Sequence, residues 1–347
     1  MYPNTTSEKI FASCWLGEDS IAIGTKDNQL SIWNIHNNST KQLSLPNTSM
    51  NYDRGCGIHD IDYFQCGNNG LMISGSDSPN DIALFETNSF QPIGLLRGHN
   101  DWVFGCKFVN ENVIFSGGKD GTVRFWKIDK ATKRHQSYSS DGKNYDSPNN
   151  NSSQLPIIRP FYQCPGYFDK IRCVSVDKSL QLCYSLNTNG SVMIWNAETM
   201  MPIHQEILDD YFELITMDIK QNENIIAVGS RSYTSIIDPR TNGDVTCVSH
   251  VDLNWGVRKV LFLDNYLMIG GGSGTVSFVD MRKYDAYNHI IYHQCHGVVR
   301  NRFINMNENN IPQAVYTISH NPSKTNLFVG GGPLLVDISG YFGSVWN

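Results

Sequence analysis

The sequence predicts an all-β protein, a seven-bladed β-propeller in which seven small sheets close into a ring. Three observations lead to this fold class: one stretch holds a complete structural repeat, the landmarks of that repeat recur seven times, and the composition suits short strands. Charged residues make up 17% of the 347 residues and aromatic residues 11%, and there are 29 glycines. This mixture is typical of short strands joined by tight turns.

Residues 98–126 contain the complete repeat. Its key polar positions are His99, Ser116, Asp120 and Trp126. At this spacing the four side chains are expected to hydrogen-bond in series within one blade, as is typical of a WD40 repeat. A buried chain of polar groups is tolerated only when each member has a partner, so the spacing is a specific signal. Lys119 lies in the turn beside them and is expected at the mouth of the propeller.

The same landmarks recur along the chain and define seven blades. Inner strands are expected at residues 9–15, 57–63, 102–108, 170–176, 212–218, 256–262 and 313–319. The third strands of the blades are expected to close on Trp33, Phe85, Trp126, Trp195, Ile237, Val279 and Trp346. The sequence therefore predicts a single seven-bladed WD40 β-propeller over residues 1–347, in which only short strand edges remain.

Two segments interrupt this rhythm. Residues 129–156 are polar and rich in Asn and Ser, which predicts a disordered loop between the third and fourth strands of blade 3, on the bottom face. Residues 296–312, with Arg300 and Arg302, join blade 6 to blade 7 and are predicted to form a loop on the top face.

Charge and cysteine content exclude several classes of function. The net charge of −6 argues against bulk attraction to nucleic acid or to an anionic membrane. Nine cysteines without a C-x-x-C pair indicate a reduced protein without a zinc site. The first residues carry no apolar signal core, so the expected location is cytoplasmic or nuclear.

Cations recur at two positions of the repeat that meet at the top of the central channel. The turns after the second strands place Lys26, Lys119 and Arg231 there. The first position of the inner strands adds Lys9 and Lys170. The third position of the inner strands adds Arg172 and Arg258, and His59 occupies the same position in blade 2. Like charges that converge on a narrow mouth are costly unless an anion binds, so one interpretation is a binding site for an extended acidic peptide tail. The alternative is that several of these cations pair with nearby carboxylates or extend into water.

No arrangement of residues suggests catalysis or a cofactor. Residues 270–274 (Gly-Gly-Gly-Ser-Gly) look like a phosphate-binding loop, but a strand pattern follows where such a loop needs a helix. A nucleophile elbow, an H-E-x-x-H motif and paired carboxylates are also missing. We therefore expect a protein that is not an enzyme.

Two third strands end in Asp-x-Arg on the opposite, bottom face. The motifs are Asp238-Pro-Arg240 and Asp280-Met-Arg282. Either each motif is a salt bridge at a strand end, or it presents an arginine for docking another protein.

Several of these stretches together resemble one family. They are residues 11–15, 55–59, 98–102, 170–172 and 238–240, and the C-terminal block Ala314-Val-Tyr-Thr317, residues 327–333 and Trp346. From about residue 8 to its end the chain resembles the twelfth DDB- and cullin-associated factor family of WD40 proteins, which are substrate receptors of cullin-4 RING ubiquitin ligases. The C-terminal block is specific, since generic WD40 proteins lack it.

The resemblance implies a concrete function. Such receptors bind proteins that end in two acidic residues, typically Glu-Glu, in a basic central pocket, and they dock on a ligase adaptor of the DDB type. The positions that match the family's pocket are Lys9, Lys26, Lys119, Lys170, Arg172 and Arg258. Arg282 matches the family's adaptor-docking arginine, and Asp280 and Arg240 are the neighbouring candidates. The alternative is a WD40 scaffold that binds other acidic or phosphorylated peptides without a ligase role.

Overall fold

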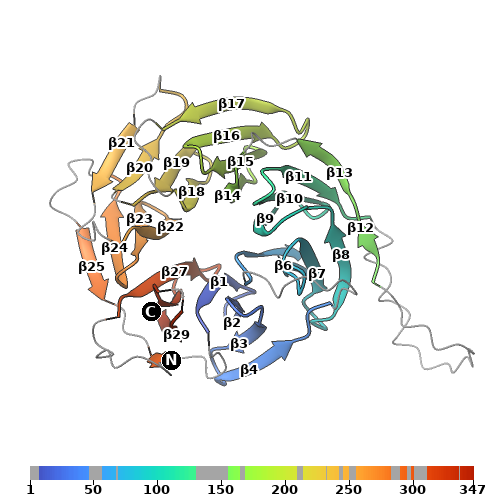
Figure 1. Cartoon of the computed structure of the whole chain (residues 1–347), viewed down its shortest axis with the longest axis horizontal. Helices are drawn as coiled ribbons and strands as arrows, with labels where there is room; N and C mark the ends of the chain where they lie inside the picture. The colour runs from blue at the N-terminus through green and yellow to red at the C-terminus, as the bar shows by residue number, and fades with distance from the viewer. Residues whose placement is uncertain are drawn as a thin grey trace, which may run out of the picture.

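The computed structural model shows a ring of seven sheets around a central channel (Figure 1). It describes residues 8–46, 57–67, 69–129, 155–164, 169–208, 214–231, 233–241, 245–249, 255–282, 290–294, 298–300, 311–335 and 337–347. These residues form strands and turns without a helix, so none of them belongs to a helix that could cross a membrane. The predicted seven-bladed β-propeller is confirmed.

Blades 1–4 follow the chain in order. Blade 1 consists of β1 (Ile10–Trp15), β2 (Ser20–Thr25), β3 (Leu30–Asn34) and β4 (Ser39–Leu43). Blade 2 consists of β5 (Ile61–Cys66), β6 (Asn69–Gly75), β7 (Asp81–Glu86) and β8 (Pro92–Arg97), with β12 (Ile157–Ile158) at its edge. Blade 3 consists of β9 (Val103–Phe108), β10 (Val113–Gly118), β11 (Val123–Lys127) and β13 (Pro160–Cys164). Blade 4 consists of β14 (Ile171–Asp177), β15 (Leu182–Asn187), β16 (Ser191–Asn196) and β17 (Pro202–Ile207).

Blades 5–7 complete the ring. Blade 5 consists of β18 (Thr216–Lys220), β19 (Ile225–Gly229), β20 (Tyr233–Ile237) and β21 (Val245–Ser249). Blade 6 consists of β22 (Val257–Leu263), β23 (Tyr266–Gly271), β24 (Thr275–Asp280) and β25 (Ile290–Gln294). Blade 7 consists of β27 (Gln313–His320), β28 (Leu327–Pro333), β29 (Ser339–Trp346) and, at its outer edge, β26 (Val298–Arg300).

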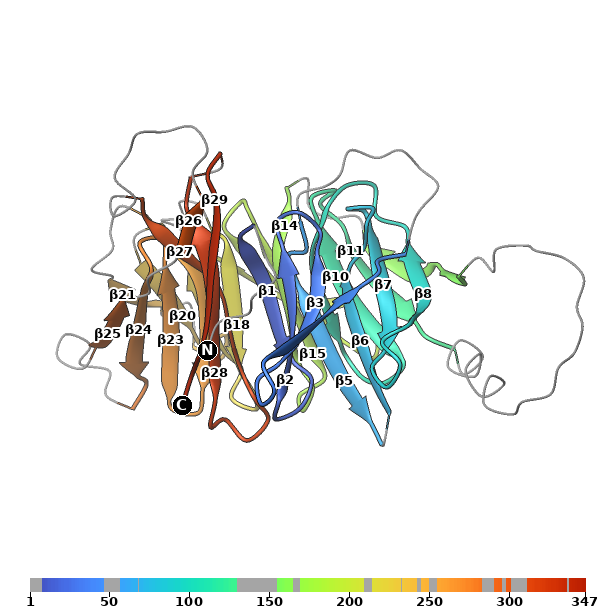
Figure 2. The same ribbon diagram turned by 90° about the horizontal axis from the view of Figure 1, so that it is seen from below.

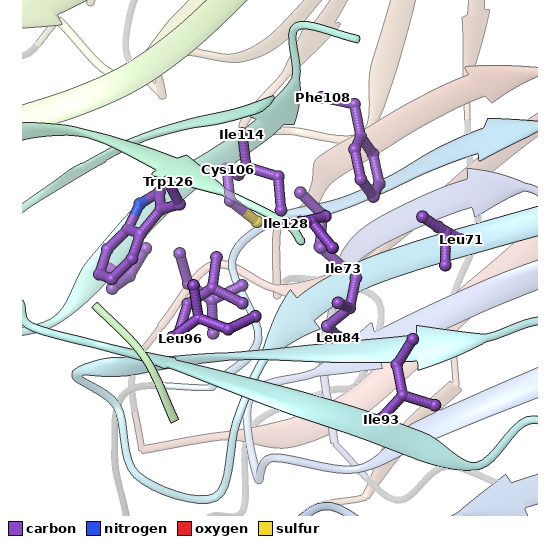
Figure 3. Packing of buried hydrophobic residues seen from close by; sticks show 13 residues of the cluster. Leu71, Ile73, Leu84, Ile93, Leu96, Cys106, Phe108, Ile114, Trp126 and Ile128 are labelled. Carbon is purple, nitrogen blue, oxygen red and sulfur yellow. The ribbon is translucent and has the colours of Figure 1, made fainter. Parts of the chain in front are cut away.

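The core lies between neighbouring blades. Between blades 2 and 3, Trp126, Phe108 and Leu96 are completely buried among aliphatic side chains from both sheets (Figure 3). A middle strand of a blade therefore packs on both of its faces. This explains why nearly every residue of β2 and of β10 is buried, instead of buried and exposed residues alternating along the strand. Each blade depends on its two neighbours for burial, so the ring is stable only when it closes.

The first and last blades close the ring through polar contacts on adjacent inner strands, β1 and β27 (Figure 1). The Ser13 hydroxyl lies 2.8 Å from the hydroxyls of both Thr317 and Ser319. The Trp15 indole N–H donates to the Ser319 carbonyl at 3.2 Å. Figure 2 shows the ring from its side, with the strands running between its two faces. We call the face at which the inner strands begin the top face and the other the bottom face.

Two outer strands differ from a simple repeat. Residues 130–154, most of the predicted loop at 129–156, lie outside the described residues, and the chain then returns as β12, which pairs in parallel with β8 of blade 2 before it forms β13. The segment predicted as a top-face loop at 296–312 includes β26, which pairs with β29 and supplies the outermost strand of blade 7. Residues 301–310, Arg302 included, lie outside the described residues.

The polar residues of the complete repeat meet inside blade 3. The Trp126 indole N–H donates to Ser116 Oγ at 2.8 Å, and Ser116 Oγ lies 2.8 Å from His99 Nε2. His99 Nδ1 lies 3.0 Å from the Asp120 carboxylate. Burial lowers the pKa of His99, although Asp120 opposes this shift. A neutral imidazole fits the series, because its Nδ1–H donates to Asp120 while its Nε2 accepts the Ser116 hydroxyl proton.

Removing the hydroxyl at the centre of this series tests its contribution to stability. Ser116→Ala leaves both the Trp126 N–H and His99 Nε2 buried without their partner, so we expect the free energy of unfolding to fall by about 2–4 kcal/mol. In blade 4 Ser185 accepts one comparable bond, from the Trp195 indole at 3.0 Å, so Ser185→Ala should cost about 1–2 kcal/mol. Urea denaturation measures both values. An equal or smaller loss at Ser116 would contradict the cooperative role of the series.

Candidate functional site

The seven inner strands enclose a cavity of about 360 Å³ along the axis of the ring. The backbone at its top is held in register by a recurring hydrogen bond. In four blades an N–H of the turn after the second strand donates to the carbonyl at the first position of the inner strand. The pairs are Lys26 to Lys9, Lys119 to Trp102, Thr188 to Lys170 and Gly272 to Gly256, at 2.7–3.0 Å. The turns and the inner-strand starts thus meet at the top face, as predicted from the sequence.

An aromatic arc lines one side of the cavity near the top. It consists of Tyr316, Phe11, His59 and Phe104. The ring centroids of Phe11 and Tyr316 are 5.1 Å apart, those of Phe11 and His59 are 5.3 Å apart, and those of His59 and Phe104 are 5.0 Å apart. Consecutive rings in contact make a stiff aromatic wall, in which the imidazole of His59 is the polar member.

Two arginines line the same level of the cavity. The guanidinium of Arg172 lies 4.5 Å from the Phe104 ring centroid, a cation–π distance. Arg258 donates from Nη2 to the Trp255 carbonyl at 3.1 Å, and its buried Nε has no hydrogen-bond partner among the described residues. An unsatisfied buried N–H of a guanidinium is costly, and a carboxylate is the group that best relieves that cost.

Below this level the charged groups neutralise one another. Lys107 Nζ lies 2.6 Å from Asp60, which also accepts the Cys106 N–H. Burial opposes the charge of Lys107, but Asp60 and Asp62 together raise its pKa above the usual value. Burial raises the pKa of Asp62 and of Asp218, and each accepts a backbone N–H at 2.7 Å. An anion is therefore favoured only near the top of the cavity.

Of the six cations predicted at the pocket, Arg172 and Arg258 line the described cavity. The four lysines are not among its lining residues. Lys119 is engaged already, since its Nζ lies 3.2 Å from an Asp101 oxygen and 4.4 Å from the Trp102 ring centroid. This is the carboxylate pairing that the sequence left open as the alternative. Lys26 is half-buried and Lys170 is exposed.

The side chain of Lys9 is buried, although the sequence predicted a cation that a ligand could reach. Only 2% of this residue is exposed, and its Nζ donates to the carbonyl of Leu335, which lies in the turn between β28 and β29. Burial, followed by the nearby Lys26, lowers the pKa of Lys9 to about 8. A ligand carboxylate reaches this ammonium group only if it displaces the Leu335 carbonyl.

The low pKa of Lys9 predicts a pH-dependent stability. Between about pH 8 and the ordinary lysine value of about 10.4, the unfolded chain holds this proton and the folded chain does not, so stability increases with pH through that range. We expect this residue to contribute a rise of roughly 2–3 kcal/mol in the free energy of unfolding, which Lys9→Met removes. Urea denaturation at a series of pH values measures it. Lys127→Met, at an exposed lysine, is the control, and a Lys9→Met profile parallel to that of the wild type would refute the assignment.

The Asp-x-Arg motifs form ion pairs at the ends of third strands. Arg282 Nη2 lies 2.7 Å from Asp280, just past the end of β24, and its guanidinium lies 5.8 Å from the Tyr266 ring centroid. Arg240 Nη2 lies 2.7 Å from Asp238 in the same way. The side chains of Arg282 and Arg240 are 57% and 62% exposed, so the salt bridge does not hide either guanidinium from a partner.

Sequence reasoning missed the aromatic arc. Phe11 and Phe104 occupy the same third position of the inner strand that identified His59, Arg172 and Arg258. The register of the repeat therefore contained this signal, but charge alone does not identify aromatic residues. Among the described residues, no group of three or more His, Cys, Asp or Glu side chains is arranged to hold a metal ion.

Comparisons with known proteins give one match over most of the chain. The model of the DDB1- and CUL4-associated factor 12 β-propeller family matches residues 4–295. The chain is also similar to the APC/C activator protein CDH1 of Saccharomyces cerevisiae, with 32% identity over 30% of this chain and 17% of the relative. It is 27% identical to the THO complex subunit 6 homolog of Danio rerio, over 39% of this chain and 35% of the relative. The matched regions thus span only a minor part of these two curated relatives.

Proposed function

Because the chain belongs to the DDB1- and CUL4-associated factor 12 β-propeller family, we propose that it is a substrate receptor of a cullin-4 RING ubiquitin ligase that binds acidic C-terminal tails in its channel. The tail, typically Glu-Glu, enters from the top face. The protein contributes binding and positioning, and the chemistry of ubiquitin transfer belongs to other subunits.

The unsatisfied Nε of Arg258 carries this proposal. Its buried Nε aims a hydrogen-bond donor at no described acceptor, beside a cavity that Arg172 also lines. A tail that ends in Glu-Glu brings three carboxylates within two residues, and arginine binds carboxylates with two parallel hydrogen bonds. The site therefore offers donors that match the charge and the geometry of such a tail.

The free carboxyl terminus of the bound tail is part of what the site recognises. The carboxylate–lysine network of Asp60, Asp62 and Lys107 neutralises the lower channel, so the cationic level at the top is where an entering chain end is stabilised. An internal Glu-Glu lacks the terminal carboxylate and cannot enter end-on, so it binds more weakly. The aromatic arc contacts the carbon atoms of the glutamate side chains.

The lysines around the mouth strengthen binding from a distance. Lys119 would exchange its contact with Asp101 for one with the tail, which reduces its net contribution. Lys26 and Lys170 act on a tail that is still partly in water, so their effect is screened by salt.

A pair of peptides tests the proposal. A peptide that ends in Glu-Glu with a free carboxyl terminus should bind at least tenfold more tightly than the same peptide amidated, because amidation removes one carboxylate from the arginines. Fluorescence polarisation measures both affinities, and that of the free peptide should fall with added salt. Equal binding of the two peptides would overturn the proposal. Tighter binding of a phosphopeptide would favour the alternative scaffold.

Substitutions of Arg258 test whether the peptide binds in the cavity. Arg258→Ala should weaken binding of the free peptide by roughly 2–5 kcal/mol, and Arg258→Lys should restore only part of it because lysine lacks the planar fork. Lys127→Ala is the matched control, since it removes one exposed positive charge far from the cavity. An equal loss for Lys127→Ala would show that only net charge matters.

The adaptor is proposed to dock on the bottom face through Arg282. Asp280 holds the guanidinium in a fixed orientation, while more than half of the side chain is exposed. An arginine fixed in this way loses little conformational entropy when it binds, which favours it as an interface anchor. Arg240 is arranged in the same way one blade earlier and would extend the same surface.

Arg282→Ala should abolish co-purification with a DDB-type adaptor and leave peptide binding unchanged. Lys127→Ala, at the end of the corresponding third strand in blade 3, should affect neither property. Pull-down with the adaptor and fluorescence polarisation with the Glu-Glu peptide separate the two functions. Adaptor binding that survives Arg282→Ala would refute this role for the arginine.

A further inference from the structure

The outer strand of blade 4, β17, leaves one of its edges open. Its sheet ends with β17, and no other described strand pairs with its outer side. The strand lies on the outer circumference of the ring (Figure 1). Ile203 and Ile207 are 55% and 65% exposed, and Met201 precedes them with 56% exposed. Isoleucines that are more than half exposed on an open strand edge are typical of a surface that pairs with another chain.

Two of the other rim strands, β8 and β4, are protected. The chain itself covers β8 by adding β12 in parallel along it. The outer strand of blade 1, β4, carries an exposed lysine, Lys41, at its centre, and its only apolar residue, Leu43, is buried. Charged residues on an edge oppose pairing with a second strand. Lysine and arginine are absent from β17, which contains Pro202, Ile203, His204, Gln205, Glu206 and Ile207.

The hydrogen bonds of β17 show which of its backbone groups are available. In the ladder with β16, Gln205 is opposite Met193 and Ile207 is opposite Ser191, and the N–H of Leu208 donates to the Gly190 carbonyl at 2.8 Å. Backbone groups alternate along a strand, so Glu206 also bonds toward β16. Gln205 and Ile207 therefore direct their N–H and C=O groups away from the blade.

We propose that a second copy of this chain binds this edge, with β17 pairing antiparallel to its own copy about a two-fold axis at Gln205. In this register Gln205 is opposite Gln205 of the second copy, and Ile203 is opposite Ile207. His204 is opposite Glu206 on the other face of the strand pair. The outward N–H and C=O groups of Gln205 then bond to their own symmetry mates, which closes the interface as a dimer.

The sequence of β17 is complementary to itself in this register and in no neighbouring one. Two Ile–Ile pairs form on one face and two His–Glu pairs on the other, both of which are favourable cross-strand neighbours. A shift of one residue places Ile203 opposite Glu206 and His204 opposite Gln205, so both kinds of pair are lost. His204 already hydrogen-bonds to Glu206 within one copy, so the pairing joins two hydrogen-bonded pairs into a group of four.

A single strand pair buries little surface, so the dimer should be weak. Interfaces at the small end of the range are typical of transient complexes. We therefore expect monomer and dimer to exchange between roughly 1 and 200 µM protein.

Sedimentation velocity of the full chain over that concentration range tests the proposal. The wild type should shift from a species of 39.1 kDa toward one of twice that mass as concentration rises. Gln205→Lys places two like charges opposite each other on the two-fold axis of the dimer. Gln205→Pro removes an outward N–H group that does not bond to β16. Both variants should remain monomeric. Gln42→Lys, which adds the same charge to the outer strand β4, should dimerise like the wild type.

A wild type that stays monomeric at every concentration would overturn the proposal. So would a Gln205→Lys protein that dimerises as well as Gln42→Lys. Thermal unfolding of each variant confirms that its ring is intact, since Gln205 is exposed and its replacement leaves the core unchanged.

Discussion

Closure of the ring is the constraint on which the rest of this structure depends. Each blade buries both faces of its sheet, so a missing neighbour would expose an entire layer of core such as that around Trp126. The last contact in this chain is made by β1 and β27, through Ser13 and Trp15 on one side and Thr317 and Ser319 on the other. Once these strands meet, seven inner strands are forced to share one narrow axis.

The site follows from that convergence. Side chains at one register position of the inner strands have no neighbouring blade to pack on and must fill the channel together. Four of them form the aromatic arc, and Arg172 packs on the end of that arc through Phe104. Arg258 is left with a donor that no described residue satisfies. The fold thus supplies a stiff aromatic wall and brings the guanidinium groups of Arg172 and Arg258 to the same cavity.

The register of the repeat was sufficient to predict the seven blades and the two arginines of the cavity. The regularly spaced apolar residues locate Trp33, Trp195 and Trp346 on third strands. The same spacing gives the positions of the inner strands whose side chains face the channel. The burial of Lys9 could not be predicted, because Leu335, which covers it, is 326 residues away in the chain. The outer strands β12 and β26 were also missed. β12 joins blade 2 after the four strands of that blade, and β26 joins blade 7 before them, so neither follows the order of the repeat. Both are also too short to show a period.

Closure of the ring covers the inner strands but leaves the outer edges of the blades exposed at the rim. The outermost strand of each blade has one edge that no neighbouring blade covers, and this chain protects two of those edges in different ways. It covers β8 with the short parallel strand β12 and places Lys41 at the centre of β4. At β17 it does neither, and there two exposed isoleucines, Ile203 and Ile207, flank a hydrogen-bonded His204–Glu206 pair. An edge that exposes apolar side chains and is complementary to its own sequence has the chemistry of an interface, whereas the polar, lysine-bearing edge of β4 has that of a solvated surface.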